Sequence, residues 1–152
     1  MRVHLCLLAA VLLLALTVAA APALARPQQL TKAQVKIACR HVPHSCARWA
    51  PLVNRYWSKY LLRRHHRIIG VRELRVALWV MWYESGGCTS CQTGDHIGLF
   101  QCSAGFYGSR PRWTALSQIA TAAMLYARRS WQPWQCTVGL ARAKARQTSY
   151  AP

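Results

Sequence analysis

The chain has 152 residues, 53% of them hydrophobic, and 20 lysines and arginines against three acidic residues, which gives a formal net charge of +17. With no internal repeat and no low-complexity linker, this length is enough for one compact domain and excludes a multidomain array. The charge predicts attraction to polyanions. It does not distinguish nucleic acid from wall polymers or lipid headgroups, and it also serves solubility.

Residues 1–25 predict a secretory signal peptide. Arg2 and His4 precede an uncharged apolar run that ends in the small-x-small sequence Ala23-Leu24-Ala25. We expect cleavage near Ala25, secretion, and a mature net charge of +16, because loss of Arg2 leaves 19 basic residues against three acidic ones. An uncleaved N-terminal anchor is the alternative interpretation.

Six cysteines remain once Cys6 is removed with the signal peptide. An even number of cysteines in a small exported domain predicts disulfides rather than metal ligands. The sequence leaves the pairing open, although Cys39 and Cys46 flank a turn between two expected helices and are one candidate pair. The cysteines expected in disulfides are Cys39, Cys46, Cys88, Cys91, Cys102 and Cys136.

The first part of the mature chain predicts a helical hairpin. Thr31 and Gln34 form a T-x-x-Q capping box, which starts a helix over about residues 32–39. A second helix is expected over about residues 46–62. The basic stretch RRHHR at residues 63–67 is expected to be a solvated loop.

The rest of the chain predicts a third helix, a hairpin and two further helices. Apolar residues recur at three- and four-residue steps over residues 71–85, and a glycine pair then provides a stop. Residues 97–101, IGLFQ, are expected to be a short strand whose hairpin partner and turn come from CTSCQTGDH. A helix is expected from about Pro111 to Arg129, with the proline early in it. WQPWQC breaks that helix, and a last short helix follows.

Glu84 occupies an electrostatically poor position for an acid. It falls in the last turn of the third expected helix, close in sequence to Trp79, Trp82 and Tyr83. Burial against aromatic rings and the negative end of a helix both disfavour an ionised carboxyl, so both predict a raised pKa. A carboxylic acid that stays protonated near neutral pH suits general acid catalysis on a glycosidic oxygen. A solvated helix-end glutamate without a role is the alternative.

Several motifs follow one another in a specific order from residue 71 to residue 144. E-S-G at residues 84–86 is followed by G-L-F-Q at 98–101, then by F-Y-G, an Ala-rich helix and WQPWQC. This order resembles the lysozyme-like superfamily, in particular soluble lytic transglycosylases and the catalytic domain of resuscitation-promoting factors. The resemblance implies an α+β, mostly helical, lysozyme-like fold with a small β-hairpin region and disulfide-pinned loops. We expect this domain to span residues 26–140, followed by a basic tail at residues 141–152.

The resemblance also implies roles for individual residues. Glu84 corresponds to the catalytic acid of these families, and Gln101 to a strand glutamine that lines the sugar cleft. Gly98 corresponds to a glycine that lets the strand run close to the substrate. Tyr107 and Trp134 fall where aromatic rings flank the glycan, although a core position is an equal alternative for Trp134.

The chain departs from the family pattern at its cysteines. Resuscitation-promoting factors often have a cysteine immediately before the catalytic glutamate, where this chain has Tyr83. Cys136 corresponds to the other half of that bridge, so its partner here would be Cys88 or Cys102. Trp113 and Trp131 are given no role in the cleft and are expected in the core.

Asp95 is the only other acid in the loop after Glu84. Its T-G-D-H context favours a turn residue, and a second catalytic carboxylate is the alternative. If Glu84 works alone, the resemblance implies that the 6-hydroxyl of N-acetylmuramic acid closes an anhydro ring. If Asp95 takes part, water is the acceptor and the enzyme is a hydrolase.

These features predict a secreted, monomeric glycosidase that cleaves the MurNAc-GlcNAc bond of peptidoglycan, either a lytic transglycosylase or a muramidase. Its expected partners are glycan strands and the anionic wall surface, with no cofactor or metal. A non-catalytic cationic wall-binding or antimicrobial protein of the same fold is the alternative.

A zinc-knuckle nucleic-acid binder is a weaker alternative. Cys88, Cys91, His96 and Cys102 have the spacing C-x2-C-x4-H-x5-C, which is one residue longer than a knuckle. Aromatic residues that would stack on bases are not placed within that loop.

Overall fold

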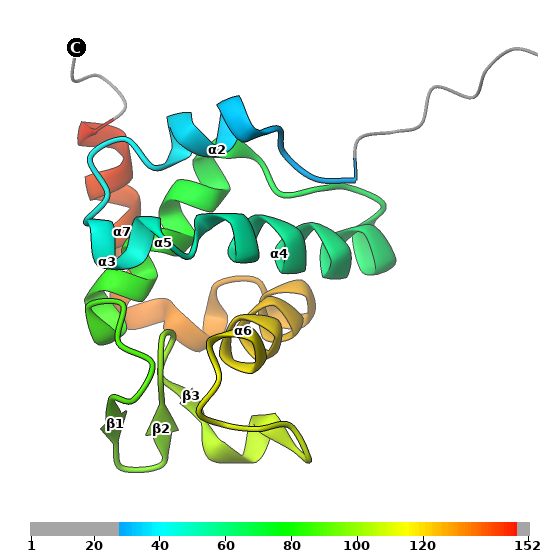
Figure 1. Cartoon of the computed structure of the whole chain (residues 1–152), viewed down its shortest axis with the longest axis vertical. Coiled ribbons are helices and arrows are strands. Elements are labelled where there is room, and N and C mark those ends of the chain that lie inside the picture. The colour runs from blue at the N-terminus through cyan, green and yellow to red at the C-terminus, as the bar shows by residue number, and fades with distance from the viewer. Residues whose placement is uncertain (1–27, 149–152) are drawn as a thin grey trace, which may run out of the picture.

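A computed structural model describes residues 28–148 as a mostly helical α+β chain with a small antiparallel sheet, as the sequence predicts (Figure 1). The expected signal peptide, Cys6 and residues 149–152 of the expected tail lie outside the described residues. Within residues 28–148, every helix is too short or too polar to cross a membrane.

The N-terminal helices begin with the predicted capping box. α2 spans Lys32–Ala38, and its first turn is closed by Thr31 and Gln34, each of which binds the backbone N–H of the other. The expected second helix is divided into α3 (His44–Ala47) and α4 (Ala50–His65). α4 runs three residues into the basic stretch predicted as a loop, and His66 ends it in the left-handed conformation with φ 55°.

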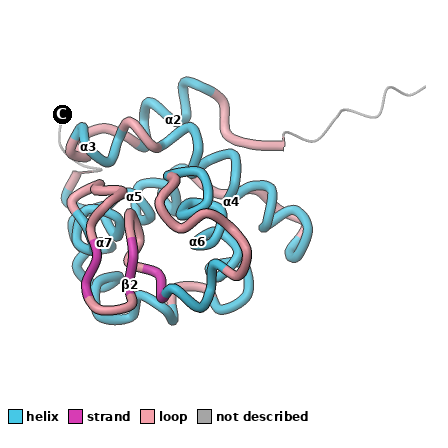
Figure 2. Tube along the Cα trace, turned by 60° about the horizontal axis from the view of Figure 1, so that its bottom comes forward, coloured by secondary structure: helices cyan, strands magenta, loops and turns pink. Residues whose placement is uncertain are grey.

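The third helix agrees with its prediction. α5 spans Val71–Ser85 and ends where Gly86 adopts φ 63°. Leu74, Leu78 and Met81 of the predicted apolar face are fully buried. α5 packs mainly against α7 and α2. From the end of α5 the chain passes into the loop that leads to the strands (Figure 1), which are drawn in magenta in Figure 2.

The sheet contains the predicted hairpin but not the predicted strand at residues 97–101. β1 (Gln92–Thr93) pairs with β2 (His96–Ile97), which pairs with β3 (Cys102–Ser103), all antiparallel. Between β2 and β3 the chain turns, because Gly98 has φ 74° and Gln101 has φ 44°, and the Gln101 N–H donates to the Gly98 carbonyl at 3.0 Å. The GLFQ segment is therefore a tight turn, and only Ile97 of the expected strand is extended.

The last two helices begin or end later than predicted. α6 spans Ala115–Arg129 and is capped by the Thr114 hydroxyl, so Pro111 precedes it instead of lying in its first turn. The short 3-10 helix η3 (Gln132–Trp134) interrupts the chain as expected, and α7 follows at Gln135–Gln147. Residues 141–147, predicted as part of a basic tail, are helical because Ala141 and Ala145 are buried.

An aromatic cluster joins α4, α6, η3 and the GLFQ turn. The Trp57 ring lies 5.1 Å from Phe100, and Phe100 lies 5.9 Å from Trp134. Trp131 continues the cluster at 4.6 Å from Tyr126 and is buried, which confirms its predicted core position. The same prediction for Trp113 is wrong, since its side chain is 54% exposed.

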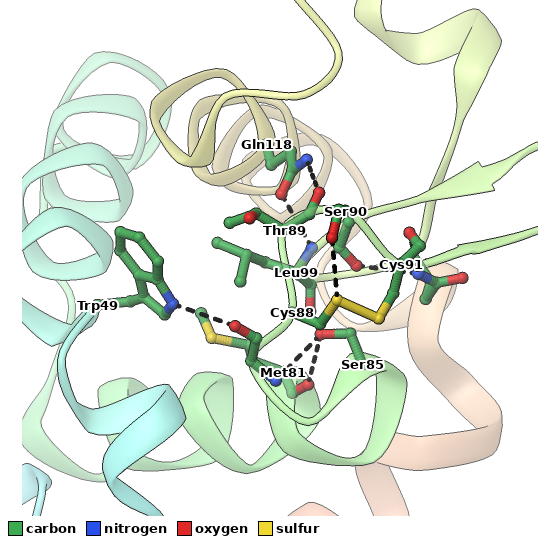
Figure 3. Close-up of a disulfide and its surroundings, with 12 residues drawn as sticks. Trp49, Met81, Ser85, Cys88, Thr89, Ser90, Cys91, Leu99 and Gln118 are labelled. Carbon is green, nitrogen blue, oxygen red and sulfur yellow. Dashed lines mark hydrogen bonds between the residues drawn. A yellow bond between two sulfur atoms is a disulfide. The ribbon is translucent and has the colours of Figure 1, made fainter.

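A buried glutamine on α6 organises the loops beside the sheet (Figure 3). The Gln118 side chain is fully buried; its Oε1 accepts from the Leu99 N–H at 3.0 Å, and its Nε2 donates to the carbonyls of Thr89 and Arg112 at 2.7 and 2.8 Å. A Cβ on Gly98 would lie 2.1 Å from the Gln118 side chain. Gly98 is therefore a close-approach glycine as expected, but the group it approaches is Gln118 inside the protein.

The cysteines pair less than predicted. Cys88 and Cys91 form a disulfide within the loop after α5 (Figure 3). The other described cysteines, Cys39, Cys46, Cys102 and Cys136, are thiols, which is contrary to the predicted disulfides. The Cys39 thiol instead donates to the Ala47 carbonyl, and Cys46 and Cys102 are buried, where desolvation raises their thiol pKa to about 11 and about 12.

We predict that Gly98→Ala lowers the free energy of unfolding by about 3 kcal/mol, because the methyl group displaces Gln118 and alanine disfavours a positive φ. Gly105→Ala is the matched control: nothing lies within 4 Å of its Cβ position, so we expect a change below about 0.5 kcal/mol. Urea unfolding followed by circular dichroism measures both values. Equal stability of the two variants would contradict the role of this contact.

Candidate functional site

Glu84 lies at the point where α5, α7 and the sheet come together. It is the penultimate residue of α5 and is partly buried. The Thr137 hydroxyl, from the first turns of α7, donates to Glu84 Oε1 at 2.6 Å. The charge of His96 on β2 also acts on this carboxyl. Three elements far apart in the sequence therefore surround one acid.

The pKa of Glu84 is raised, as the sequence predicts. Desolvation by burial is the largest cause, and it outweighs the Thr137 hydrogen bond and the charge of His96, which both lower the pKa. The protonated form of Glu84 is thus favoured relative to an exposed glutamate. A carboxyl in this state can donate a proton to a bound group at a higher pH than an ordinary glutamate can.

The residues after Glu84 fix the end of α5. The Ser85 hydroxyl donates to the Leu99 carbonyl at 2.9 Å and accepts from the Gly87 N–H at 3.2 Å, which ties the helix end to the GLFQ turn (Figure 3). Gly87 has φ 84°, and a Cβ there would lie 2.5 Å from the Ser45 carbonyl oxygen. The E-S-G-G sequence therefore holds the carboxyl in place through Ser85 and through close packing on α3.

A cavity of about 310 Å³ includes two lining residues that interact electrostatically with this carboxyl, and its volume is at the lower end of the range for small-molecule sites. Its walls come from β2, β3, the short 3-10 helix η2 (Ala104–Tyr107), α6, η3 and the start of α7, and they include His96, Cys102, Phe106 and Arg129. Glu84 is not a lining residue, but its charge raises the pKa of Cys102 and it interacts with His96, and both of those residues line the cavity. Glu84 and the cavity are therefore linked through His96 and Cys102.

Gln101 lines this cavity, and its expected role in lining a sugar cleft stays a prediction. Its Nε2 donates to the carbonyls of Gly98 and Cys91 at 3.0 and 3.2 Å, which fixes the orientation of the amide. Its Oε1 is buried and has no hydrogen-bond partner within residues 28–148. Gln101 also has a positive φ of 44°, which is uncommon for a residue with a side chain. A strained residue with a free acceptor is typical of a binding site.

The aromatic residue exposed at the cavity differs from the predicted one. Tyr107 is buried and donates its hydroxyl to the Ile97 carbonyl at 3.1 Å, so it is a core residue. Its neighbour Phe106 is 40% exposed and lines the cavity, with the Arg129 guanidinium 5.9 Å from its ring centre. Trp134 combines the two expected positions. It lines the cavity, and it is also buried, with its indole N–H donating to the Phe100 carbonyl at 2.8 Å.

Asp95 is a turn residue between β1 and β2. Its Oδ2 accepts from the Ser103 hydroxyl at 2.5 Å and its Oδ1 lies 3.0 Å from His96 Nδ1. The Ser103 hydrogen bond is the largest effect on this exposed carboxylate and lowers its pKa. These contacts brace the hairpin against β3, which supports the turn interpretation over a second catalytic carboxylate.

The residues with zinc-like spacing do not form a ligand set. Cys88 and Cys91 are bonded to each other, and the Cys102 thiol is buried on β3 with a raised pKa. Between residues 28 and 148, no group of three or more His, Cys, Asp and Glu side chains is arranged to hold a metal ion. The zinc interpretation is therefore without support at this loop.

Sequence reasoning missed three residues of the site. Thr137 bonds to Glu84 across 53 positions of the chain, and Gln118 holds the GLFQ turn. Phe106 was read only as part of an aromatic-glycine pair. No local pattern marks Thr137, because its contact with Glu84 joins two helices that are far apart in the sequence.

No protein-family model, curated protein or solved structure matches the chain. The function of this site is therefore inferred from its own geometry.

We predict that Thr137→Val raises the pKa of Glu84 further, because it removes the hydrogen bond that stabilises the carboxylate and keeps the side-chain volume. Thr137→Ser is the matched control and should leave the pKa near that of the parent. The pH titration of the Glu84 carboxyl carbon by NMR measures both. A valine variant that titrates like the parent would show that Thr137 does not act on Glu84.

Proposed function

We propose that the chain is an exported glycosidase that cleaves peptidoglycan, with Glu84 as its general acid. The observation that carries this proposal is a partly buried carboxyl with a raised pKa that interacts with two lining residues, His96 and Cys102, of a cavity that amide and aromatic side chains also line. Apolar faces and hydrogen-bonding amides suit sugars, which have C–H faces and hydroxyl edges. The lysozyme-like motif order from residue 71 to residue 144 is consistent with this substrate, and the expected signal peptide with its location.

In this mechanism Glu84 protonates the oxygen of the bond that follows N-acetylmuramic acid, and the bond breaks through an oxocarbenium-like transition state. The Glu84 carboxylate then takes a proton from the group that attacks. Gln101 forms part of the cavity wall, where the carbonyls of Gly98 and Cys91 hold its amide, and Phe106 packs against a sugar ring. Thr137 is a positioning residue, since it acts on the orientation and pKa of Glu84.

The identity of the attacking group decides between two reactions. The Ser103 and His96 contacts of Asp95 leave Glu84 as the acid best suited to both proton transfers. This favours attack by the 6-hydroxyl of the same N-acetylmuramic acid, which gives an anhydro sugar. We therefore propose a lytic transglycosylase, and hydrolysis by water is the competing outcome.

We predict that the parent releases anhydro-muropeptides from purified peptidoglycan and that Glu84→Gln lowers this activity at least about 100-fold, because glutamine cannot supply the proton. Mass spectrometry of the released sugars measures the products. Asp95→Asn is the matched control, since it also removes one carboxylate from the same region, and should retain most of the activity.

Reducing-end products that disappear in Asp95→Asn would replace this mechanism by two-carboxylate hydrolysis. If the parent releases no sugars from peptidoglycan, the enzyme proposal is overturned and a cationic wall-binding protein is the function that remains.

We predict that the stability difference between Glu84→Gln and the parent depends on pH with a defined sign. A carboxyl whose folded-state pKa is raised contributes stability that is fully present below the unfolded-state pKa of about 4.5 and is lost as pH rises through the folded-state pKa. Glutamine does not ionise. The melting temperature of the variant minus that of the parent should therefore increase as the pH rises from 4 to 8. The same rise should reduce the parent's activity.

Scanning calorimetry across this pH range compares the two proteins, and the other titrating groups cancel in the difference. A variant that instead loses stability relative to the parent as the pH rises would show that the ionised form of Glu84 is the favoured one in the folded state.

A further inference from the structure

A hollow lined by four arginines lies outside the cavity beside Glu84. It has a volume of about 450 Å³, and its charged residues are Arg63 and Arg64 from the end of α4, Arg128 from the end of α6, and Arg110 from the loop before α6. We call it the arginine hollow. The two helix ends are held together because His65 Nε2 donates to the Ala127 carbonyl at 2.8 Å.

The charge of the arginine hollow is not balanced within the protein. The chain has three acids, and each is engaged elsewhere: Glu73 with Arg67 at 2.8 Å, Glu84 with Thr137, and Asp95 with Ser103. Each of the two helix C-termini contributes roughly half a negative charge. Together these ends offset about one of the four positive charges, so a surplus of about three remains.

Arg110 is already oriented in the hollow. Its side chain is half-buried, and its guanidinium donates to the Thr121 hydroxyl at 3.4 Å and contacts Met124 Sδ at 3.9 Å. These contacts reduce the conformational entropy that the side chain would lose on binding a ligand. A guanidinium has five N–H donors, so the group can still bind an oxyanion in a bidentate manner.

The surface between the arginine hollow and the cavity is also concave and basic. Arg129 lines the cavity together with Gln101. Arg128 and Arg129 both line an intervening hollow of about 410 Å³, and Arg128 lines the arginine hollow as well. A polymer strand that leaves the cavity past Arg129 would therefore pass Arg128 and then reach the arginine hollow.

We propose that the arginine hollow binds the anionic groups, phosphodiester or carboxylate, of a wall polymer whose neutral sugars enter the cavity. This inference rests on the proposed function, because it assigns the same polymer to both sites. The concave shape suits a thin chain. A membrane surface would instead require exposed apolar residues around the arginines, and the most exposed ones, Trp113, Leu116 and Leu140, do not line this hollow. Only one aromatic residue, Tyr60, is available for base stacking, which disfavours a nucleic acid.

The test compares two variants with the same change in net charge. The first is Arg63→Gln, Arg64→Gln and Arg128→Gln, three exposed positions in the hollow. The control is Lys32→Gln, Lys36→Gln and Arg40→Gln, three exposed positions of which the first two lie on α2 and the third lies two residues after its end. Both are made in the full chain with Glu84→Gln, so that the wall is not cleaved during measurement.

Binding to purified cell walls is measured by cosedimentation over a series of salt concentrations. We expect the hollow variant to bind about tenfold more weakly than the Glu84→Gln parent, with a shallower dependence on salt, and the control to stay within about twofold. Equal losses in the two variants would mean that only net charge matters and would overturn the proposal.

Treated walls identify the anion. Loss of the tenfold difference after acid removal of phosphodiester polymers assigns the site to phosphate, and its loss only after amidation of carboxyl groups assigns it to carboxylate. Transfer RNA that binds more tightly than walls, and does so through the same three arginines, would overturn the proposal in favour of a nucleic acid. Because cleavage is not measured, these outcomes stand whether or not the parent releases sugars.

Discussion

The contact between Gly98 and the buried Gln118 amide is the constraint on which the site depends. Gln118 satisfies the Leu99 N–H and the Thr89 carbonyl, so it joins the GLFQ turn to the Cys88–Cys91 loop. A side chain at position 98 would prevent this approach. With the turn held there, the Leu99 carbonyl faces Ser85 and Gln101 lies at the cavity wall. The position of Glu84 relative to the cavity therefore follows from one buried polar side chain.

The three acids of this basic chain show how local surroundings decide the state of a carboxyl. Burial favours the protonated form of Glu73, but hydrogen bonds from Arg67, Tyr126 and the Gly70 N–H outweigh it and lower the pKa. The exposed Asp95 has its pKa lowered mainly by Ser103. Glu84 has only one strong hydrogen-bond donor, Thr137, against a similar burial, so its pKa is raised. Among the acids of the chain, Glu84 alone is suited to donate a proton.

The sequence predicted those parts of the fold that depend on neighbours along the chain. The capping box of α2, the apolar periodicity of α5 and the Gly86 stop are local, and all three are present in the structure. The errors arose where contacts between segments far apart in the sequence determine whether a side chain is buried. Trp113 is exposed and Tyr107 is buried because packing against α6 and β2 sets their environment, which aromatic type alone does not report.

The GLFQ segment shows the same limit within the site. Its apolar residues suggested a strand, but buried Leu99 and Phe100 belong to a turn whose polar groups are satisfied by Gln118 and Trp134. The pairing of cysteines is equally non-local, and among the cysteines of residues 28–148 only the pair separated by three positions forms a disulfide. Glu84 and Gln101 were found because the motif order pointed to them, whereas Thr137, 53 positions from Glu84, carries no local signal.

A raised carboxyl pKa in a chain of net charge +17 requires that local desolvation outweigh the field of the whole protein. Surface charges farther away than the Debye length, about 8 Å at physiological ionic strength, are largely screened. His96 is the cation whose charge acts on Glu84, and its effect is smaller than that of burial. The arginines of the hollow lie at the ends of α4 and α6 and in the loop before α6, and Glu84 is not among the residues that line this hollow. Spatial separation thus allows one small domain to combine a strongly basic surface with an acid whose pKa is raised.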